Sequence, residues 1–290
     1  MTLLLPLIAF LIGYFAVQYL SPFRPFLALI LAKILIPVII IYHMVFYQQG
    51  SIWLMLFSFF SSLLMYLFFY SRDQDRLKAL CLSYLNMAWL GFPFALAVFG
   101  TEATSPMVAL YIGGSVFGNI CAVMALGDGT QSKQSIFRKV ILSPPIIALS
   151  IAALLLPWDF SDDQNHVVIQ SVYLTSKWLM TFTGMCILGM WLSQVRIQFQ
   201  DLLESTRFAI QKLILGLLFC AFAYYCLPIP QDFITFSVML MFFCLPPAAN
   251  IVALETHYQG TGRSARYIAS DTVVSCILIG CLWLLVHILT

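Results

Sequence analysis

Charged side chains are scarce in this 290-residue chain: Lys, Arg, Asp and Glu together make up 9% of it, against about 25% in ordinary soluble domains. Hydrophobic residues make up 62%, and the mean hydropathy is +0.96. Because so few polar groups cannot cover a water-exposed surface, the composition argues against a soluble enzyme, a nucleic-acid binder and a disordered protein. The net charge of +2 also gives no sign of a nucleic-acid partner. The sequence therefore predicts a polytopic membrane protein whose outer surface is covered by the lipid bilayer.

Motifs that bind metals or nucleotides are missing as well. The chain has no HExxH or HxxxH spacing and no GxxxxGK[ST] loop, and its eight cysteines form no CxxC pair. Those cysteines lie in or beside apolar runs, where they serve as small core residues. Since no set of His, Asp, Glu or Cys gathers at one depth, we expect no enzyme and no cofactor other than a coupling H⁺ or Na⁺.

Long apolar runs dominate the chain and predict an all-α fold. The runs are continuous rather than alternating, which disfavours a β-barrel. About 20 apolar residues are needed for one helix to cross the hydrocarbon core. On this basis we predict ten transmembrane helices, at Leu3–Leu20, Ala28–Tyr47, Ile52–Tyr70, Ala79–Phe99, Pro106–Leu126, Phe137–Leu156, Gln170–Leu192, Phe208–Leu227, Phe233–Leu254 and Tyr267–Leu289.

The basic residues alternate with these spans. Thirteen of the 14 Lys and Arg follow odd-numbered spans, and only Lys177 does not. The positive-inside rule then puts the odd loops in the cytoplasm and both termini outside, in a bacterial inner or plasma membrane. The first apolar run has no basic residue before it, so we interpret it as a retained helix rather than a signal peptide.

Ten spans divide into two sets of five around a polar linker. We predict a first repeat at residues 1–126, a cytoplasmic linker at 127–139 and a second repeat at 140–290. Because five is odd, the second repeat enters the membrane with the opposite orientation, as in inverted-repeat transporters. Lys33 in the second span and Lys177 in the seventh occupy similar positions in the two repeats.

The fourth and ninth spans carry prolines in mid-run. Pro93 follows Gly91 in the fourth span, and Pro246 with Pro247 interrupts the ninth. A mid-helix proline lacks an N–H and clashes with the carbonyl four residues back, here that of Trp89, Phe242 or Phe243. The freed groups must face protein, water or a ligand.

Broken helices at matching places in two repeats indicate a central binding site. Asn86 and Asn250 add side-chain amides close to the two breaks. We therefore predict that substrate binds where the two broken helices cross, at Asn86, Gly91, Pro93, Pro246, Pro247 and Asn250. Asn119, amid the glycines of the fifth span, either lines this cavity or only permits close packing.

Several stretches resemble the auxin efflux carrier family of permeases. They are Ile12-Gly13-Tyr14, Lys33 with Ile36-Pro37, Asn86 with Gly91-Phe92-Pro93, Ser143-Pro144 with Ile147-Ala148, Leu188-Gly189 with Leu192, and Leu245-Pro246-Pro247-Ala248-Ala249-Asn250 followed by Leu254-Glu255, Tyr258 and Ser270-Asp271-Thr272-Val273. The resemblance implies an inverted five-plus-five repeat with two crossing broken helices, similar to the bile acid–sodium symporters. It also implies transport of small organic anions such as auxin or dicarboxylates.

Two positions depart from that family's pattern. Thr181 and Thr183 lie where the seventh span of the family usually has a proline, and Asp271 replaces a small hydroxyl residue. The second departure bears on how transport would be coupled to an ion.

Three ionisable residues are candidates for ion coupling: Asp271, Glu255 and Lys33. Each also has a simpler interpretation. Asp271 and Glu255 would form salt bridges with Arg266 and Arg263 at the cytoplasmic ends of their helices, and Lys33 would extend to the membrane surface.

The sequence thus predicts a secondary active transporter of small organic anions that works by alternating access. A sodium-coupled symporter or cation exchanger of similar fold is the alternative. A receptor without an output domain stays open as a different class, and so does assembly as a homodimer.

Overall fold

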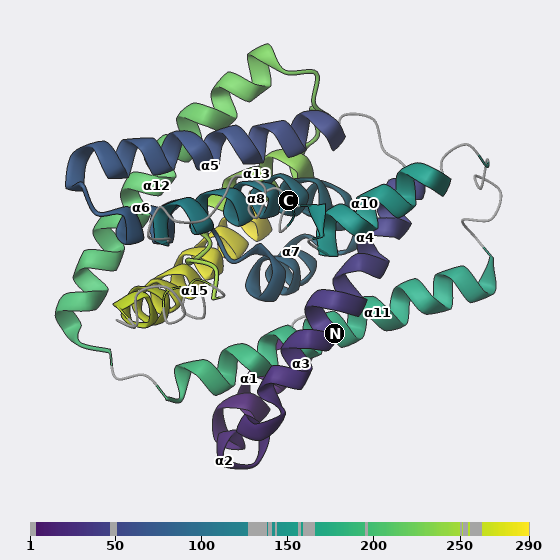
Figure 1. The fold of residues 1–290 in the computed structure, drawn as a ribbon, viewed down its shortest axis with the longest axis horizontal. Helices are drawn as coiled ribbons and strands as arrows, with labels where there is room; N and C mark the ends of the chain where they lie inside the picture. The colour runs from purple at the N-terminus through teal and green to yellow at the C-terminus, as the bar shows by residue number, and fades with distance from the viewer. Residues whose placement is uncertain are drawn as a thin grey trace.

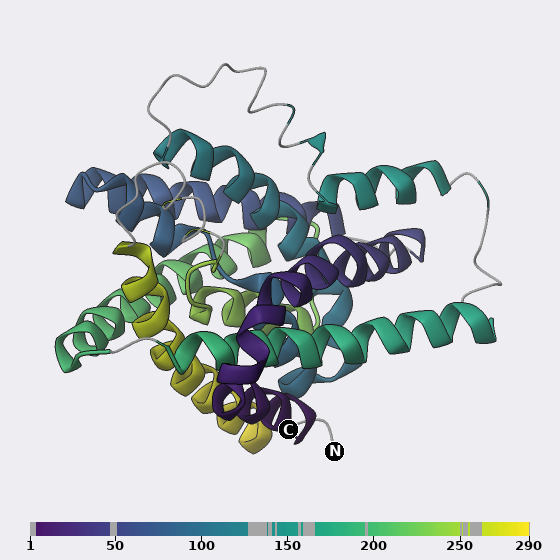
Figure 2. The ribbon, with the colours of Figure 1, turned by 60° about the horizontal axis from the view of Figure 1, so that its bottom comes forward.

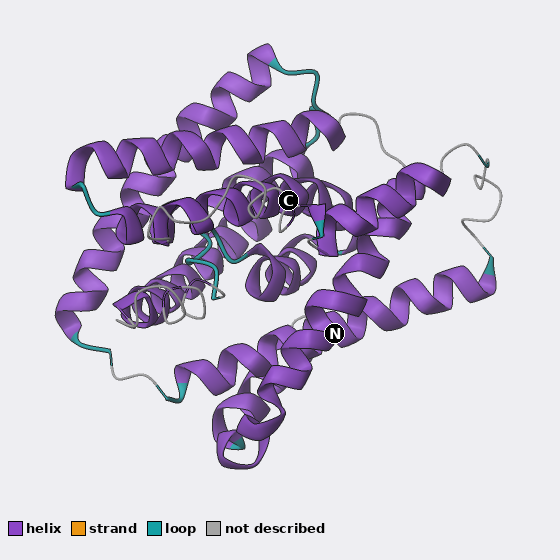
Figure 3. Cartoon of the chain, viewed as in Figure 1, coloured by secondary structure: helices purple, strands orange, loops and turns teal. Residues whose placement is uncertain are grey.

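Within the part that the structure describes, the regular elements are helices, joined by loops and by one isolated antiparallel bridge (Figure 3). The structure is a computed structural model that describes residues 4–46, 51–126, 138, 141–142, 144–155, 158, 166–194, 197–249, 251, 255 and 263–289. The predicted linker at 127–139 lies almost entirely outside these residues. The helices are α1 (Leu4–Phe15), α2 (Val17–Leu20), α3 (Arg24–Ile30), α4 (Ile36–Val45), α5 (Ser51–Asp73), α6 (Arg76–Ser83), α7 (Phe92–Phe99), α8 (Thr104–Leu126), α10 (Pro144–Leu155), α11 (Val167–Leu192), α12 (Phe199–Cys226), α13 (Phe233–Cys244) and α15 (Arg263–Leu289).

Several of these helices have the length and composition of membrane spans. Among the described residues, five stretches are long and apolar enough to cross a bilayer: Val17–Tyr42, Ile52–Asp73, Thr101–Leu126, Phe199–Cys226 and Arg263–Leu284. The shorter apolar helices Ile146–Leu155 and Phe233–Cys244 fall within the sixth and ninth predicted spans. The prediction of an all-α, multi-pass membrane protein is confirmed at this level.

The helix in the eighth predicted span begins earlier than expected. Helix α12 starts at Phe199 rather than Phe208, because Gln198 and Asp201 form a reciprocal capping box at its first turn. Asp201 and Arg207, which precede the predicted start of this span, lie on the first turns of the helix. Lys212, counted above with the cytoplasmic basic residues, therefore lies near the midpoint of the 28-residue helix.

The helices form two packed groups (Figure 1, Figure 2). In the first group α5 packs on α8 and α6, and α12 packs on α15 and α13. In the second group α1 packs on α11, and α4 packs on α10. Helix α7 and the turn before it contact α11 on one side and α8 on the other, so this segment connects the two groups.

Two glycines permit the close approach of α1 and α11. A Cβ added at Gly13 would lie 2.0 Å from the backbone oxygen of Cys186, and one added at Gly189 would lie 2.2 Å from that of Phe10. Small residues at such a crossing let two helix backbones touch, which is how membrane helices commonly associate.

We expect Gly13→Ala to lower the free energy of unfolding by about 1–3 kcal/mol, because the new methyl group has to displace the α11 backbone. Thermal unfolding of the detergent-purified protein measures the change. Gly280→Ala is the matched control, since nothing lies within 4 Å of its Cβ position. That helical substitution should stabilise by about 0.5–1 kcal/mol. Equal stabilities of the two variants would contradict the close crossing.

Candidate functional site

The interrupted helices in the fourth and ninth predicted spans meet at a short antiparallel junction. Helix α6 ends at Ser83 and α13 at Cys244, and the chain is extended beyond each. The Asn86 N–H donates to the Pro246 carbonyl at 2.7 Å, and the Ala248 N–H donates to the Tyr84 carbonyl at 2.8 Å. Leu85 and Pro247 form the bridge between these bonds. Backbone groups released from one helix thus bind those released from the other.

The break in the fourth span lies upstream of its proline. Pro93 is in the first turn of α7, directly after a π-helical turn at Met87–Gly91. The wider turn lets the helix continue although the proline lacks a donor. Pro37 follows the π-helical turn Leu31–Leu35 in the same way. The expectation that Pro93 itself breaks the helix is wrong, since the extended residues precede Met87.

The ninth span breaks where expected, at its two prolines. Leu245 leaves the helix with φ −71° and ψ 148°. The Phe242 carbonyl, which was expected to be released, instead accepts the Leu245 N–H at 3.2 Å. The carbonyl that accepts a hydrogen bond from a cationic side chain is that of Leu245, and the donor is the Lys212 ammonium.

Glycine makes room for the junction at two places. A Cβ at Gly91 would lie 2.4 Å from the Met107 side chain and 3.0 Å from that of Leu245. One at Gly118 of α8 would lie within 2.1 Å of the Tyr84 ring. The glycine-rich fifth span therefore packs directly against the extended segment of the fourth.

The predicted polar ligands are described in part. Asn86 is buried at the junction, with 6% of its surface exposed. Asn250 lies outside the described residues, and for Asn119 only the helical backbone of α8 is described. Of the predicted binding residues, the structure brings Asn86 together with Pro246 and Pro247 at the junction, and Gly91 packs beside Leu245.

A buried charge pair adjoins the junction. The Lys212 ammonium donates to the Leu245 carbonyl at 2.9 Å and lies 3.6 Å from Oδ2 of Asp271. The two side chains are 1% and 4% exposed. Asp271 thus pairs with Lys212 rather than with Arg266, which binds Asp201 at 2.5 Å. Sequence reasoning missed this role of Lys212, because it placed the residue near the cytoplasmic start of the eighth predicted span. The capping signal at Gln198 and Asp201 would have placed it near the middle of a helix.

The other two coupling candidates lie in different surroundings. The fully buried Glu255 carboxylate accepts the N–H groups of Arg263 at 2.7 Å and Ser264 at 2.8 Å, and it binds the Ser264 hydroxyl. It therefore caps the first turn of α15, where a negative charge is favourable. Lys33 is exposed on its π-helical turn.

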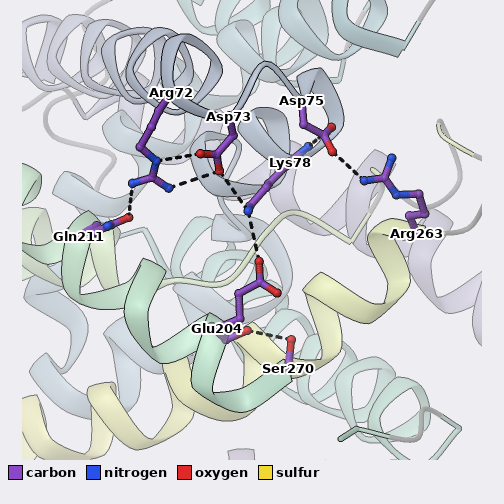
Figure 4. Close-up of polar contacts among 9 residues, drawn as sticks. Arg72, Asp73, Asp75, Lys78, Glu204, Gln211, Arg263 and Ser270 are labelled. Carbon is purple, nitrogen blue, oxygen red and sulfur yellow. Dashed lines mark hydrogen bonds and ion pairs between the residues drawn. The ribbon is translucent and has the colours of Figure 1, made fainter. Parts of the chain in front are cut away.

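One end of the first helix group carries an ionic network (Figure 4). Lys78 binds Asp73 at 3.0 Å and Glu204 at 3.2 Å, while Arg72 binds Asp73 at 2.8 Å and donates to Gln211 at 2.8 Å. These contacts join the end of α5 and the first turn of α6 to α12. The predicted loops after the third and seventh spans therefore lie at the same end of the molecule.

The loop after the ninth predicted span joins this end through Asp75. The Asp75 carboxylate binds the Arg263 guanidinium at 2.6 Å. It also caps α6 by accepting the backbone N–H of Lys78 at 3.1 Å. Burial raises the pKa of Asp75, but these hydrogen bonds and the guanidinium charge outweigh it and hold the pKa below its usual value. The carboxylate is therefore ionised at neutral pH, and the tie to Arg263 persists there.

A second buried lysine opens on a small cavity. Lys177 of α11 is 8% exposed and lies over the Tyr173 ring at 5.6 Å from its centroid. It forms no ion pair with any described residue. With Pro93 and Thr181 it lines a cavity of about 130 Å³ beside α7. This lysine is the one basic residue that does not follow an odd-numbered predicted span, and its side chain is buried.

Comparison with known proteins adds no assignment. The chain matches no protein-family model and no curated protein.

We expect Glu255→Ala to lower the free energy of unfolding by about 1–2 kcal/mol, because the first N–H groups of α15 lose their acceptor. Glu255→Gln is the control: its amide oxygen still accepts one of these bonds, so it should lose less. Thermal unfolding at neutral pH compares the two variants. A capping role would be refuted if alanine and glutamine variants both unfolded at the wild-type temperature.

Proposed function

We propose that this protein is a secondary active transporter of small organic anions, in which substrate binds at the junction of the two broken helices. The observation that carries the proposal is the antiparallel pairing of Tyr84–Asn86 with Pro246–Ala248 inside a helical membrane protein. Non-helical backbone at membrane depth is tolerated where protein buries it or where it lines a binding cavity.

The packing pattern supports an inverted five-plus-five repeat of ten spans. In such a repeat, α1 of the first span corresponds to α10 of the sixth, and α4 of the second span corresponds to α11 of the seventh. The contact between α1 and α11 therefore corresponds to the contact between α10 and α4, and both pairs are in contact. In the same way, α5–α8 corresponds to α12–α15, and α5–α6 corresponds to α12–α13. A pseudo-two-fold relation between the repeats accounts for this correspondence. It is the architecture that the resemblance to the auxin efflux carriers implies.

The charge pattern near α7 favours an anion. Lys177 has no carboxylate partner among the described residues, and its cavity adjoins Pro93. A buried ammonium is costly unless a counter-ion offsets it, and a substrate carboxylate would supply that charge. At the other end of this helical segment, beside the junction, the N–H groups of the turn that starts at Met87 also favour a negative charge, whereas the Lys177 cavity lies along the C-terminal half of α7.

Movement between the two helix groups would give alternating access. The first group, α5, α6, α8, α12, α13 and α15, contains both broken ends, and the second, α1, α4, α10 and α11, packs against α7 and α8. A rigid displacement of one group relative to the other would open the junction alternately to the two faces of the membrane.

We expect Asn86→Ala and Asn250→Ala to reduce uptake of the anion by reconstituted vesicles at least tenfold, since each removes a side-chain amide that is predicted to bind the anion. The anion is first identified by a thermal-shift screen of mono- and dicarboxylates. Asn165→Ala, in the predicted outer loop after the sixth span, is the matched control and should transport normally. Unchanged uptake by both asparagine variants, with the fold intact, would reject the site.

The two lysines in matching spans provide a second test. Lys177→Gln should weaken binding of the anion about tenfold, because losing one charge contact at about 1.4 kcal/mol changes an equilibrium tenfold. Lys33→Gln is the control, since the Lys33 side chain is exposed. Dissociation constants from thermal shifts compare the two, and equal losses would remove Lys177 from the site.

A further inference from the structure

The C-terminal end of α13 meets a buried cation and a buried anion. Helix α13 ends at Cys244, and the next carbonyl, that of Leu245, accepts the Lys212 ammonium at 2.9 Å. Oδ2 of Asp271 lies 3.6 Å from the same nitrogen and has no hydrogen-bond partner among the described residues. Three separate helices thus place one positive charge between a helix end and a carboxylate.

These surroundings are those that broken helices offer to a sodium ion. The C-terminal end of a half-helix carries a partial negative charge, and the carbonyls released there are ligands for Na⁺ in transporters with interrupted helices. A carboxylate completes such a site by balancing the charge. Here the ammonium of Lys212 holds that position.

We propose that Lys212 is a tethered cation that fills the cation site formed by the end of α13 and Asp271, so that the wild-type protein binds no Na⁺ there. The inference deepens the proposed function, because it states which ion the junction excludes. It distinguishes this chain from a sodium-coupled symporter of the same architecture.

The energetics favour a bound ammonium over an empty site. Both charges are almost fully buried, and removing one partner of such a pair leaves the other uncompensated, at a cost of several kcal/mol. Lys212 also donates a hydrogen bond to the Leu245 carbonyl, which would otherwise have no partner at the end of the helix. A free cation has to lose its translational freedom on binding, whereas a side chain on the rigid helix α12 has lost it already.

The test is ion-specific stabilisation of the purified full-length protein. Thermal unfolding is measured in NaCl and in choline chloride at equal ionic strength, for wild type, Lys212→Met and the double variant Lys212→Met/Asp271→Asn. Wild type should unfold at the same temperature in both salts. Lys212→Met should be less stable in choline and gain about 3 °C in sodium at ten times its dissociation constant. The double variant should lose this gain, because it lacks the carboxylate.

Two results would overturn the proposal. One is sodium-specific stabilisation of the wild type, which needs no variant to fold. The other is a folded Lys212→Met protein that responds equally to sodium and choline.

Should Lys212→Met not fold, Lys212→Ala prepared in methylammonium replaces it. Recovery of a folded protein by methylammonium but not by choline would support the site, and no recovery would oppose it. All of these measurements report binding, so a failure of anion transport in vesicles would reject the proposed function and leave the cation site standing.

Discussion

Inside a bilayer every backbone N–H and C=O has to find its partner within the protein, and this constraint shapes the centre of the molecule. Two helices stop there, at Ser83 and at Cys244. Each would expose polar groups to hydrocarbon if it stopped alone. By stopping beside one another they pair through Asn86 and Ala248, so neither break is tolerable without the other.

The residues around the junction follow from that requirement. The absence of a side chain at Gly118 makes room for the Tyr84 ring, and its absence at Gly91 makes room for Leu245. The Lys212 ammonium donates a hydrogen bond to the Leu245 carbonyl, which has no partner in the pairing of the two segments. The charge so introduced is balanced by Asp271 from α15. One interruption of the backbone therefore accounts for a glycine-rich span, a buried lysine and a buried aspartate on three different helices.

The fold class was readable from composition, because long apolar runs and few charges leave little alternative to membrane helices. The broken spans were also readable, since proline in mid-run has a definite steric effect. The break in the fourth span was misplaced because a π-helical turn accommodates Pro93, and such turns have no sequence signature of comparable strength. Lys212 was placed near the cytoplasmic end of a helix because the predicted span began at Phe208, whereas Gln198 and Asp201 cap a helix that begins at Phe199 and puts Lys212 near its middle. Which acid pairs with which base depends on tertiary packing between α12 and α15, and periodicity carries no information about it.

The two consecutive prolines have a mechanical consequence. Pro246 and Pro247 have fixed φ angles, and the residue before a proline is restricted to extended conformations. The Leu245 carbonyl, bound to Lys212, and the Pro246 carbonyl, bound to Asn86, thus belong to adjacent peptide units of a stiff segment. Such a segment resists bending and does not act as a hinge. It keeps the charge pair and the polar junction at a constant separation, so that any large displacement of the helices has to be absorbed elsewhere along the chain.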